Sequence, residues 1–164
     1  MGDNEADGAA VPKGTDWMQN SVERCLGLDL GEKRIGVALS DPLGWTAGPL
    51  TAVARIGWRR DLAALRSLID SHEVCRVIVG LPIRMDGTAG ERARRTQEFV
   101  ERLRASLSIP VESWDERLTT AQAERVLLEA DVRREKRRQV VDSMAASLIL
   151  QGYLDYRNAG GIPR

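Results

Sequence analysis

Hydrophobic positions in the first part of the chain follow the period of strands. The run over residues 25–30 is apolar apart from one carboxylate, Asp29, which is typical of a central strand buried on both faces. Apolar side chains alternate with small ones over residues 35–40, and a poorer strand covers about residues 48–53. Short turns separate these runs, so we expect three strands in an antiparallel meander.

In the rest of the chain, stretches in which apolar residues recur at helical spacing alternate with short apolar runs typical of strands. Buried strands are predicted over residues 76–81 and 111–114. Capping-box spacing of Thr88 with Glu91, and of Thr119 with Gln122, predicts the starts of two helices. The remaining expected elements are a helix over residues 58–71, a polar connection over residues 132–135 and a last helix over residues 137–156. This order predicts an α/β fold with a mixed five-stranded sheet, three antiparallel strands and then two parallel ones, with helices packed on it.

Length and composition favour a single domain. The 164 residues are 43% hydrophobic, which is enough for one core. We expect a flexible tail at residues 1–22, the domain at residues 23–158 and a short tail at residues 159–164. No apolar run approaches the ~18 residues of a membrane span or resembles a signal peptide, so we expect a cytoplasmic protein without a membrane partner. Cys25 and Cys75 are interpreted as buried thiols.

Charge is balanced, with 24 basic and 24 acidic residues. A protein that only coats nucleic acid is usually strongly basic, whereas a nuclease combines a basic surface with an acidic site, and the two cancel in the sum. Arginines over residues 92–104 are mixed with glutamates and are interpreted as a solvated helix face. The basic residues predicted to hold nucleic acid are Lys33, Arg34, Arg117, Arg134, Arg137 and Arg138.

Acidic residues lie where a sheet of this kind presents ligands. Asp29 is costly to bury in an apolar strand unless it is paired or bound to metal. Asp115 and Glu116 follow a strand, and because strand side chains alternate, only one of them is expected to face the site. Asp142 stands beside small apolar residues on the inward face of the last helix. The structural alternatives are an Asp29 that caps the turn at Gly31, loop acids paired with Arg117, and an Asp142 paired with Arg138.

Together these acids favour a metal site. Carboxylates held close repel one another strongly unless a cation lies among them. Oxygen ligands favour Mg²⁺ or Mn²⁺, and two such ions would clamp a phosphodiester between the attacking and leaving oxygens. No Cys/His zinc pattern occurs in the sequence, and the single histidine, His72, is interpreted as structural.

Four separated motifs resemble, in the same order, those of the YqgF/RuvX family. They are residues 26–31 with 34–38, residues 78–82 with 85–88, residues 115–120, and residues 141–142 with 145–146 and 149–151. The resemblance runs from about Arg24 to Tyr156. It implies an RNase H-like domain related to Holliday-junction resolvases and a nuclease role in maturing the 5′ end of pre-16S ribosomal RNA.

The resemblance also implies which acids are functional. The family's acidic positions fall on Asp29, on Asp115 and Glu116, and on Asp142, and we take Glu116 as the ligand of the middle pair. Residues 80–82 hold no carboxylate where many RNase H-like nucleases have one, as the family leads one to expect. Glu32 departs from the family, whose members often carry a small or hydroxyl residue there.

Other functions compete with the nuclease. The strand and hairpin around Asp29 also resemble the phosphate-binding start of actin-like ATPases, but the chain is too short for two such domains and lacks a later Gly-rich phosphate loop. A non-catalytic RNA-binding factor in ribosome assembly is a second alternative. Cleavage of four-way DNA junctions is a third, and the resemblance favours RNA over it. A symmetric resolvase would be a dimer, and the sequence leaves monomer and homodimer open.

Overall fold

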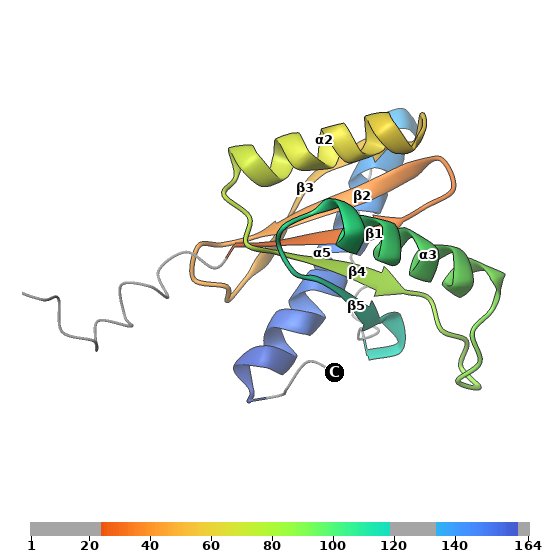
Figure 1. Ribbon diagram of the computed structural model, residues 1–164. Coiled ribbons are helices and arrows are strands. Elements are labelled where there is room, and N and C mark those ends of the chain that lie inside the picture. Colours follow the sequence, from red (N-terminus) through yellow and green to blue (C-terminus); the bar gives the residue numbers. More distant parts are fainter. Residues whose placement is uncertain (1–23, 119–133, 161–164) are drawn as a thin grey trace, which may run out of the picture.

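The computed structural model describes residues 24–118 and 134–160, which form one sheet with helices on both faces (Figure 1). The strands are β1 (Cys25–Leu30), β2 (Arg34–Ser40), β3 (Ala47–Ala54), β4 (Arg76–Leu81) and β5 (Val111–Asp115). The helices are α2 (Trp58–Ser71), α3 (Glu91–Ser106) and α5 (Arg134–Asn158), and a short 3₁₀ turn, η1 (Glu116–Leu118), follows β5.

The five strands form a mixed sheet in the order β3-β2-β1-β4-β5. β2 is antiparallel to both β1 and β3, whereas β4 runs parallel to β1 and β5 runs parallel to β4. This arrangement confirms the predicted fold class. Because β1, β4 and β5 run in one direction, their carboxyl ends meet at one edge of the sheet, which we call the carboxyl edge. The opposite edge, where these strands begin, is the amino edge.

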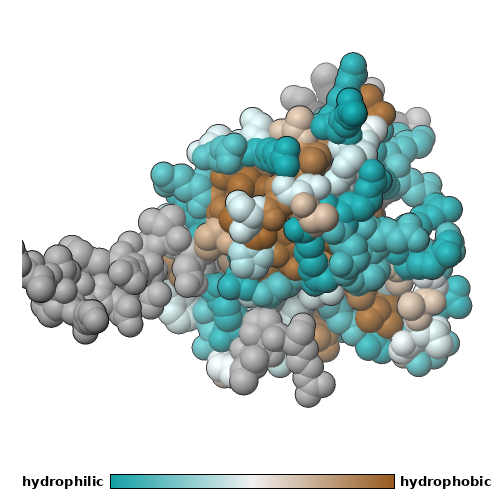
Figure 2. Space-filling model, in the orientation of Figure 1, coloured by the Kyte–Doolittle hydropathy of each residue, from teal (hydrophilic) through white to brown (hydrophobic). Residues whose placement is uncertain are grey.

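The two faces of the sheet carry separate apolar cores. α2 and α3 pack on one face, over the leucines of β1 and over Val77 and Val79 of β4. α5 packs on the opposite face, over Cys25, Ala38 and Ile78, and lies behind the sheet in Figure 1. Figure 2 shows apolar surface between α2 and α3, with hydrophilic side chains along both helices. Since strand residues alternate between faces, the position of Asp29, two and four residues after Gly27 and Cys25, puts it on the α5 face.

Two local predictions are wrong at helix starts. α3 begins at Glu91 behind Gly90, without a side-chain cap, so Thr88 does not form the predicted capping box. The Thr88 hydroxyl donates instead to Asp86 Oδ1 at 2.6 Å, because a local turn competes for this side chain. α5 begins at Arg134, so part of the expected polar connection over residues 132–135 is helical. The helix predicted after Thr119 and the whole tail predicted at residues 1–22 lie outside the described residues.

None of the helices in the described part of the chain is long and apolar enough to cross a membrane. Of the two cysteines, Cys25 is buried and Cys75 is half-buried.

Candidate active site at the carboxyl edge

Three glycines on neighbouring strands let α5 lie directly on the sheet. A Cβ atom added at Gly36 of β2 would lie 2.0 Å from the Asp142 carbonyl oxygen, and one at Gly27 of β1 would lie 2.7 Å from Leu150 Cβ. At Gly80 of β4 such an atom would lie 2.5 Å from a side chain of α5. Only glycine permits so close an approach of a helix to a strand. We call Gly27, Gly36 and Gly80 the glycine seats of α5.

The seat at Gly36 brings two of the predicted acids together. Gly36 is the cross-strand partner of Asp29, and the backbone of Asp142 rests on it. The Asp29 side chain is only 18% exposed. Burial raises the pKa of Asp29, the charge of Arg92 opposes this rise, and the charge of Asp142 adds to it. The ionised form of Asp29 is therefore held at an energetic disadvantage.

Glu116 joins the same site, whereas its neighbour Asp115 does not. A Cβ atom at Gly80 would lie 2.8 Å from Glu116 Oε1, so the Glu116 side chain lies over β4 on the α5 face. Burial raises the pKa of Glu116, and the charge of Asp29 raises it further. The Asp115 carboxylate accepts hydrogen bonds from the Arg117 guanidinium, at 2.7 Å for the shortest, and this contact lowers the pKa of Asp115. The two neighbouring acids thus have different surroundings.

Two arginines compensate the charge of the acids. Arg34 Nε donates to Asp142 Oδ2 at 2.9 Å, and both side chains are less than one-third exposed. Arg92 of α3 places its Nη2 4.0 Å from Asp29 Oδ1 and is 65% exposed. The sequence had suggested Arg138 as a partner of Asp142, but this carboxylate pairs with Arg34 of β2.

The other basic residues predicted to bind nucleic acid are spread around this edge. Arg117 lies in η1, next to Glu116, and pairs with Asp115. Lys33 is exposed in the turn between β1 and β2, and Arg138 is exposed near the start of α5. Arg134 and Arg137 lie in the first turns of α5, but their side chains are outside the description.

The donor chemistry of the site suits a divalent cation, although its geometry is not that of an assembled metal centre. Within residues 24–118 and 134–160, no three His, Cys, Asp or Glu side chains gather closely enough to hold an ion. Asp29 and Glu116 are disfavoured as anions by burial and by proximity, which a cation would relieve. Carboxylate oxygens are the ligands that Mg²⁺ and Mn²⁺ prefer. The residues therefore fit such an ion if Asp142 exchanges its contact with Arg34.

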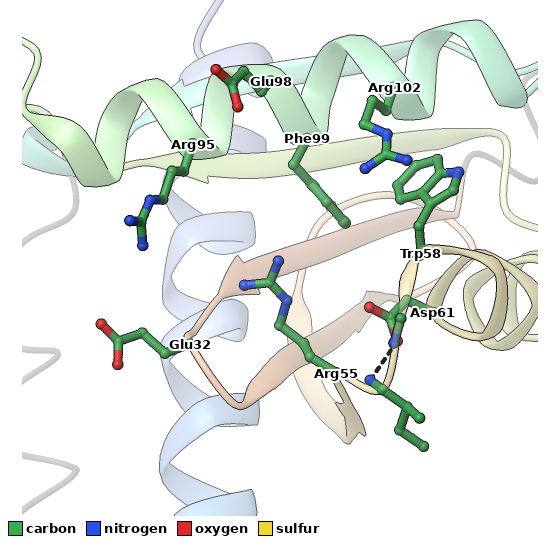
Figure 3. Close-up of a pocket in the computed structure, with 10 residues that line it drawn as sticks. Glu32, Arg55, Trp58, Asp61, Arg95, Glu98, Phe99 and Arg102 are labelled. Carbon is green, nitrogen blue, oxygen red and sulfur yellow. Dashed lines mark hydrogen bonds between the residues drawn. The ribbon is translucent and has the colours of Figure 1, made fainter.

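A cavity of about 500 Å³ opens on the other face of the sheet, between α3 and the start of α2 (Figure 3). Arg102 covers the Trp58 ring, 4.2 Å from its centroid, and Phe99 meets the same ring edge to face. A second cavity of about 540 Å³ shares Arg55 with the first and reaches Arg92. Acidic and basic side chains alternate along both cavities, and the three site carboxylates line neither of them. The candidate site is thus an open edge of the sheet.

Two features of the site, Arg92 and the glycine seats, were not predicted from the sequence. Arg92 was assigned to a solvated helix face because glutamates surround it, and the chain offers no local signal that it reaches Asp29. The glycines did carry a signal: each stands alone in a strand, which indicates a bulge or a close backbone approach.

Comparison with known proteins adds independent information. A family model described as "RuvX: Holliday junction resolvase" matches residues 23–156. A protein of Symbiobacterium thermophilum is 56% identical over 133 residues, 81% of this chain and 92% of that protein. A protein of Halothermothrix orenii is 53% identical over 135 residues, 82% of this chain and 96% of that protein. Both relatives carry the name "Putative pre-16S rRNA nuclease".

Solved structures show a likeness in fold. "T. thermophilus RuvC in complex with Holliday junction substrate" superposes with a TM-score of 0.56 at 15% identity, and covers 87% of this chain and 99% of that chain. At this level of identity the likeness concerns architecture alone. It confirms the RNase H-like fold that the sequence motifs implied.

Proposed function

Because the chain belongs to the RuvX family, we propose that it is a metal-dependent nuclease that hydrolyses phosphodiester bonds in processing the 5′ end of pre-16S ribosomal RNA. Relatives that are more than half identical to this chain carry an rRNA nuclease name, whereas the likeness to the junction resolvase rests on fold. RNA is therefore the first substrate, and a four-way DNA junction, which the description of the family names, is the second. We infer from this proposed role in ribosome biogenesis that the protein would act in the cytoplasm.

The convergence of Asp29, Glu116 and Asp142 on one edge of the sheet carries this proposal. Two strand ends and one helix bring these acids together, and the glycine seats hold the helix close enough to do so. Burial and mutual repulsion raise the pKa of both Asp29 and Glu116, which makes the arrangement unfavourable for stability alone. Perturbed acids gathered at an exposed edge are typical of functional sites.

In the proposed reaction these three side chains would hold Mg²⁺ or Mn²⁺. A bound ion supplies Lewis-acid stabilisation of the negative charge that develops on the phosphate. Arg92, which faces Asp29 and is mostly exposed, would bind a phosphate oxygen of the nucleic acid. Arg34 would hold Asp142 in place before the substrate arrives. Lys33 and Arg138 would contact the phosphate backbone of the nucleic acid farther from the three acids. The number of ions and the choice between monomer and homodimer stay predictions.

A cleavage assay tests this proposal. Wild type, Asp29→Asn and Glu116→Gln are compared on an end-labelled pre-16S leader RNA, an unrelated single-stranded RNA and a four-way DNA junction, each with Mg²⁺, Mn²⁺ or EDTA. We expect metal-dependent cleavage of the leader and a loss of at least ~100-fold in either variant, more than supporting residues of metal sites usually cause. Asp115→Asn is the matched control, because it changes the neighbouring acid and should retain most activity.

Each alternative has its own outcome in this assay. Cleavage confined to the junction would move the protein to the resolvase function. Tight RNA binding without cleavage, equal in wild type and Asp29→Asn, would make it a non-catalytic assembly factor. Loss of activity in Asp115→Asn with retention in Glu116→Gln would reverse the assignment of the middle ligand.

A further inference from the structure

The segment between β4 and α3 folds into a small, well-defined hairpin over residues 83–89. Ile83 and Ala89 form a bridge at its base, and Arg84 N–H donates to the Thr88 carbonyl at 3.1 Å. The turn closes when Gly87 N–H donates to the Arg84 carbonyl at 2.8 Å, and Gly87 adopts the positive φ of 86° that such a turn requires. In Figure 1 this segment stands out from the body of the molecule between β4 and α3.

Met85 occupies the tip of this hairpin and is 92% exposed, the highest value among the exposed large hydrophobic side chains of the described residues. The turn does not need it, because turns favour Gly, Pro, Asn, Asp and Ser, and Asp86 and Gly87 already supply that chemistry. The Asp86 carboxylate accepts two hydrogen bonds from Thr88, at 2.6 and 2.9 Å, which fixes the direction in which the tip points. A flexible apolar side chain is thus presented to solvent on an ordered support.

The hairpin lies next to the carboxyl edge of the sheet. A Cβ atom at Gly87 would lie 3.6 Å from Arg117 Nη1, and Arg117 directly follows Glu116. The Arg84 guanidinium covers Gly90, where an added Cβ atom would lie 2.9 Å from its Nε. Arg117 therefore lies beside the turn at the tip, Arg84 lies at the base of the hairpin, and the acid site begins where the chain leaves β4. An apolar tip with cations on its carboxyl-edge side and at its base is suited to a strand whose bases are apolar on their faces and whose backbone is anionic.

We propose that Met85 inserts between bases of an RNA strand bound at the carboxyl edge and unstacks them beside the phosphate that is cut. Apolar side chains, Met among them, act as such wedges in other nucleic-acid complexes. The thioether packs well against aromatic faces, and Arg84 at the base of the hairpin would bind a phosphate, as would Arg117 once it exchanges its contact with Asp115. This inference rests on the proposed nuclease function and adds a specific contact to it, which would favour unpaired segments over a continuous duplex.

Fluorescence of RNA that carries 2-aminopurine at one position at a time tests the insertion, because this base brightens when it is unstacked. The probe is the leader RNA cut by wild type, with replacements on both sides of the mapped cut. Asp29→Asn serves as the background so that the RNA stays intact. We expect a rise at one or two positions next to the cut. Adding Met85→Ser should abolish most of it, and Met85→Leu should keep it.

Cleavage rates provide the second readout. In the otherwise wild-type chain, Met85→Ser should slow cleavage by about tenfold or more, the effect of losing one buried apolar side chain, while affinity for the RNA changes less. Met85→Leu should stay close to wild type. Leu43→Ser is the matched control, since Leu43 is 63% exposed on another turn, outside the site.

Three results would overturn the insertion. If wild type cuts the leader and Met85→Ser keeps both the fluorescence rise and the cleavage rate, the nuclease function holds but Met85 does not insert between bases. Met85→Ser could change the oligomeric state on a sizing column and nothing else, which would make the hairpin a contact between copies of the chain. If wild type neither binds nor cuts the leader or the junction, the proposed function itself fails, and the insertion fails with it.

Discussion

α5 covers ionisable side chains at both edges of the sheet, and the two groups differ in how their charge is compensated. At the amino edge, Glu112 of β5 forms an ion pair with Arg76 of β4, and Tyr153 of α5 is buried beside them. Burial, and then the charge of Glu112, raise the pKa of Tyr153 to about 12, so this hydroxyl stays neutral. At the carboxyl edge, burial and then the charge of Asp142 raise the pKa of Asp29, burial and then the charge of Asp29 raise the pKa of Glu116, and Arg92 only opposes these rises.

The difference separates a structural group from a functional one. A carboxylate paired with a guanidinium, as Glu112 is with Arg76, contributes to the fold, and Asp142 can bind a ligand only by exchanging its contact with Arg34. Carboxylates that are buried next to one another keep that capacity, at a cost in stability. Both groups lie under α5 on the same face of the sheet, so burial alone does not distinguish the acids of the candidate site from Glu112. The sign of the charges next to each carboxylate does distinguish them.

Gly36→Ala should have the largest effect on this arrangement. The new methyl group would lie 2.0 Å from the Asp142 carbonyl oxygen, so α5 must move away from β2. We expect the free energy of unfolding to fall by about 3 kcal/mol or more, and cleavage to fall with it because Asp142 leaves the site. Urea unfolding followed by circular dichroism measures the first effect. Gly48→Ala in β3 is the control, since nothing lies within 4 Å of its added Cβ. Equal stabilities of the two variants would contradict the close seating of α5.

Arg76→Met should have an intermediate effect at the amino edge. It leaves Glu112 half-buried without its cation, and we expect a loss of about 1–3 kcal/mol, below the range for fully buried pairs because both side chains retain some exposure. Cleavage per folded molecule should be unchanged. Arg94→Met, which breaks an exposed pair with Glu91 on α3, should leave stability almost unchanged. A double variant with Glu112→Gln should recover much of the loss, and failure to do so would show that the pair matters through packing.

Asp29→Asn should have the smallest effect on stability, and in the opposite direction. The folded-state pKa of Asp29 is raised above its unfolded value, so ionising it lowers stability as pH rises through that pKa, and the penalty is complete at neutral pH. In EDTA at neutral pH the variant should therefore melt above wild type, by about 2–4 °C for each kcal/mol relieved, and the gain should vanish below about pH 4.

Asp41→Asn should change stability in the direction opposite to Asp29→Asn. Backbone N–H groups, chiefly that of Thr46, lower the pKa of Asp41, so its ionised form stabilises the fold above the unfolded pKa. This variant should melt below wild type at neutral pH, and the difference should also vanish in acid. Melting curves of Asp29→Asn that match wild type at every pH would show that the charge at the carboxyl edge is already compensated without metal.

The sequence predicted the fold well because each element carries a strong local period. β1, β4 and α2 have the predicted bounds, the bounds of β2, β3 and β5 differ from prediction by at most one residue, and α5 ends two residues later than predicted. The starts of α3 and α5 are wrong, because turn chemistry at Thr88 and charged residues before α5 gave misleading signals. The positions of Asp29 and Glu116 also followed from local rules, since both stand at strand ends. The alternation of strand side chains predicted that only one of Asp115 and Glu116 faces the site, and the choice of Glu116 followed the family resemblance and stays a prediction.

Contacts across the fold were harder to foresee. That Asp142 pairs with Arg34 rather than Arg138 depends on where α5 crosses β2, and this crossing is set by Gly36, more than a hundred residues earlier in the chain. Arg92 reaches Asp29 because α3 begins close to the carboxyl edge, a position that no local pattern encodes. The catalytic roles of the three acids stay predictions.

α5 is a single long helix that runs from the carboxyl edge of the sheet to the amino edge, so it connects side chains at the two edges rigidly. Tyr153 lies beside Glu112 and Arg76 at the amino edge, and Asp142 stands eleven residues earlier, about 16 Å along the helix axis. Because a helix resists stretching, a displacement of one end along the helix axis displaces the other end by nearly the same distance. Changes of apolar side-chain volume under this end of α5 that shift the helix along its axis are therefore expected to displace Asp142 and slow the proposed cleavage, whereas Arg76→Met, which leaves the apolar residues under α5 in place, is not.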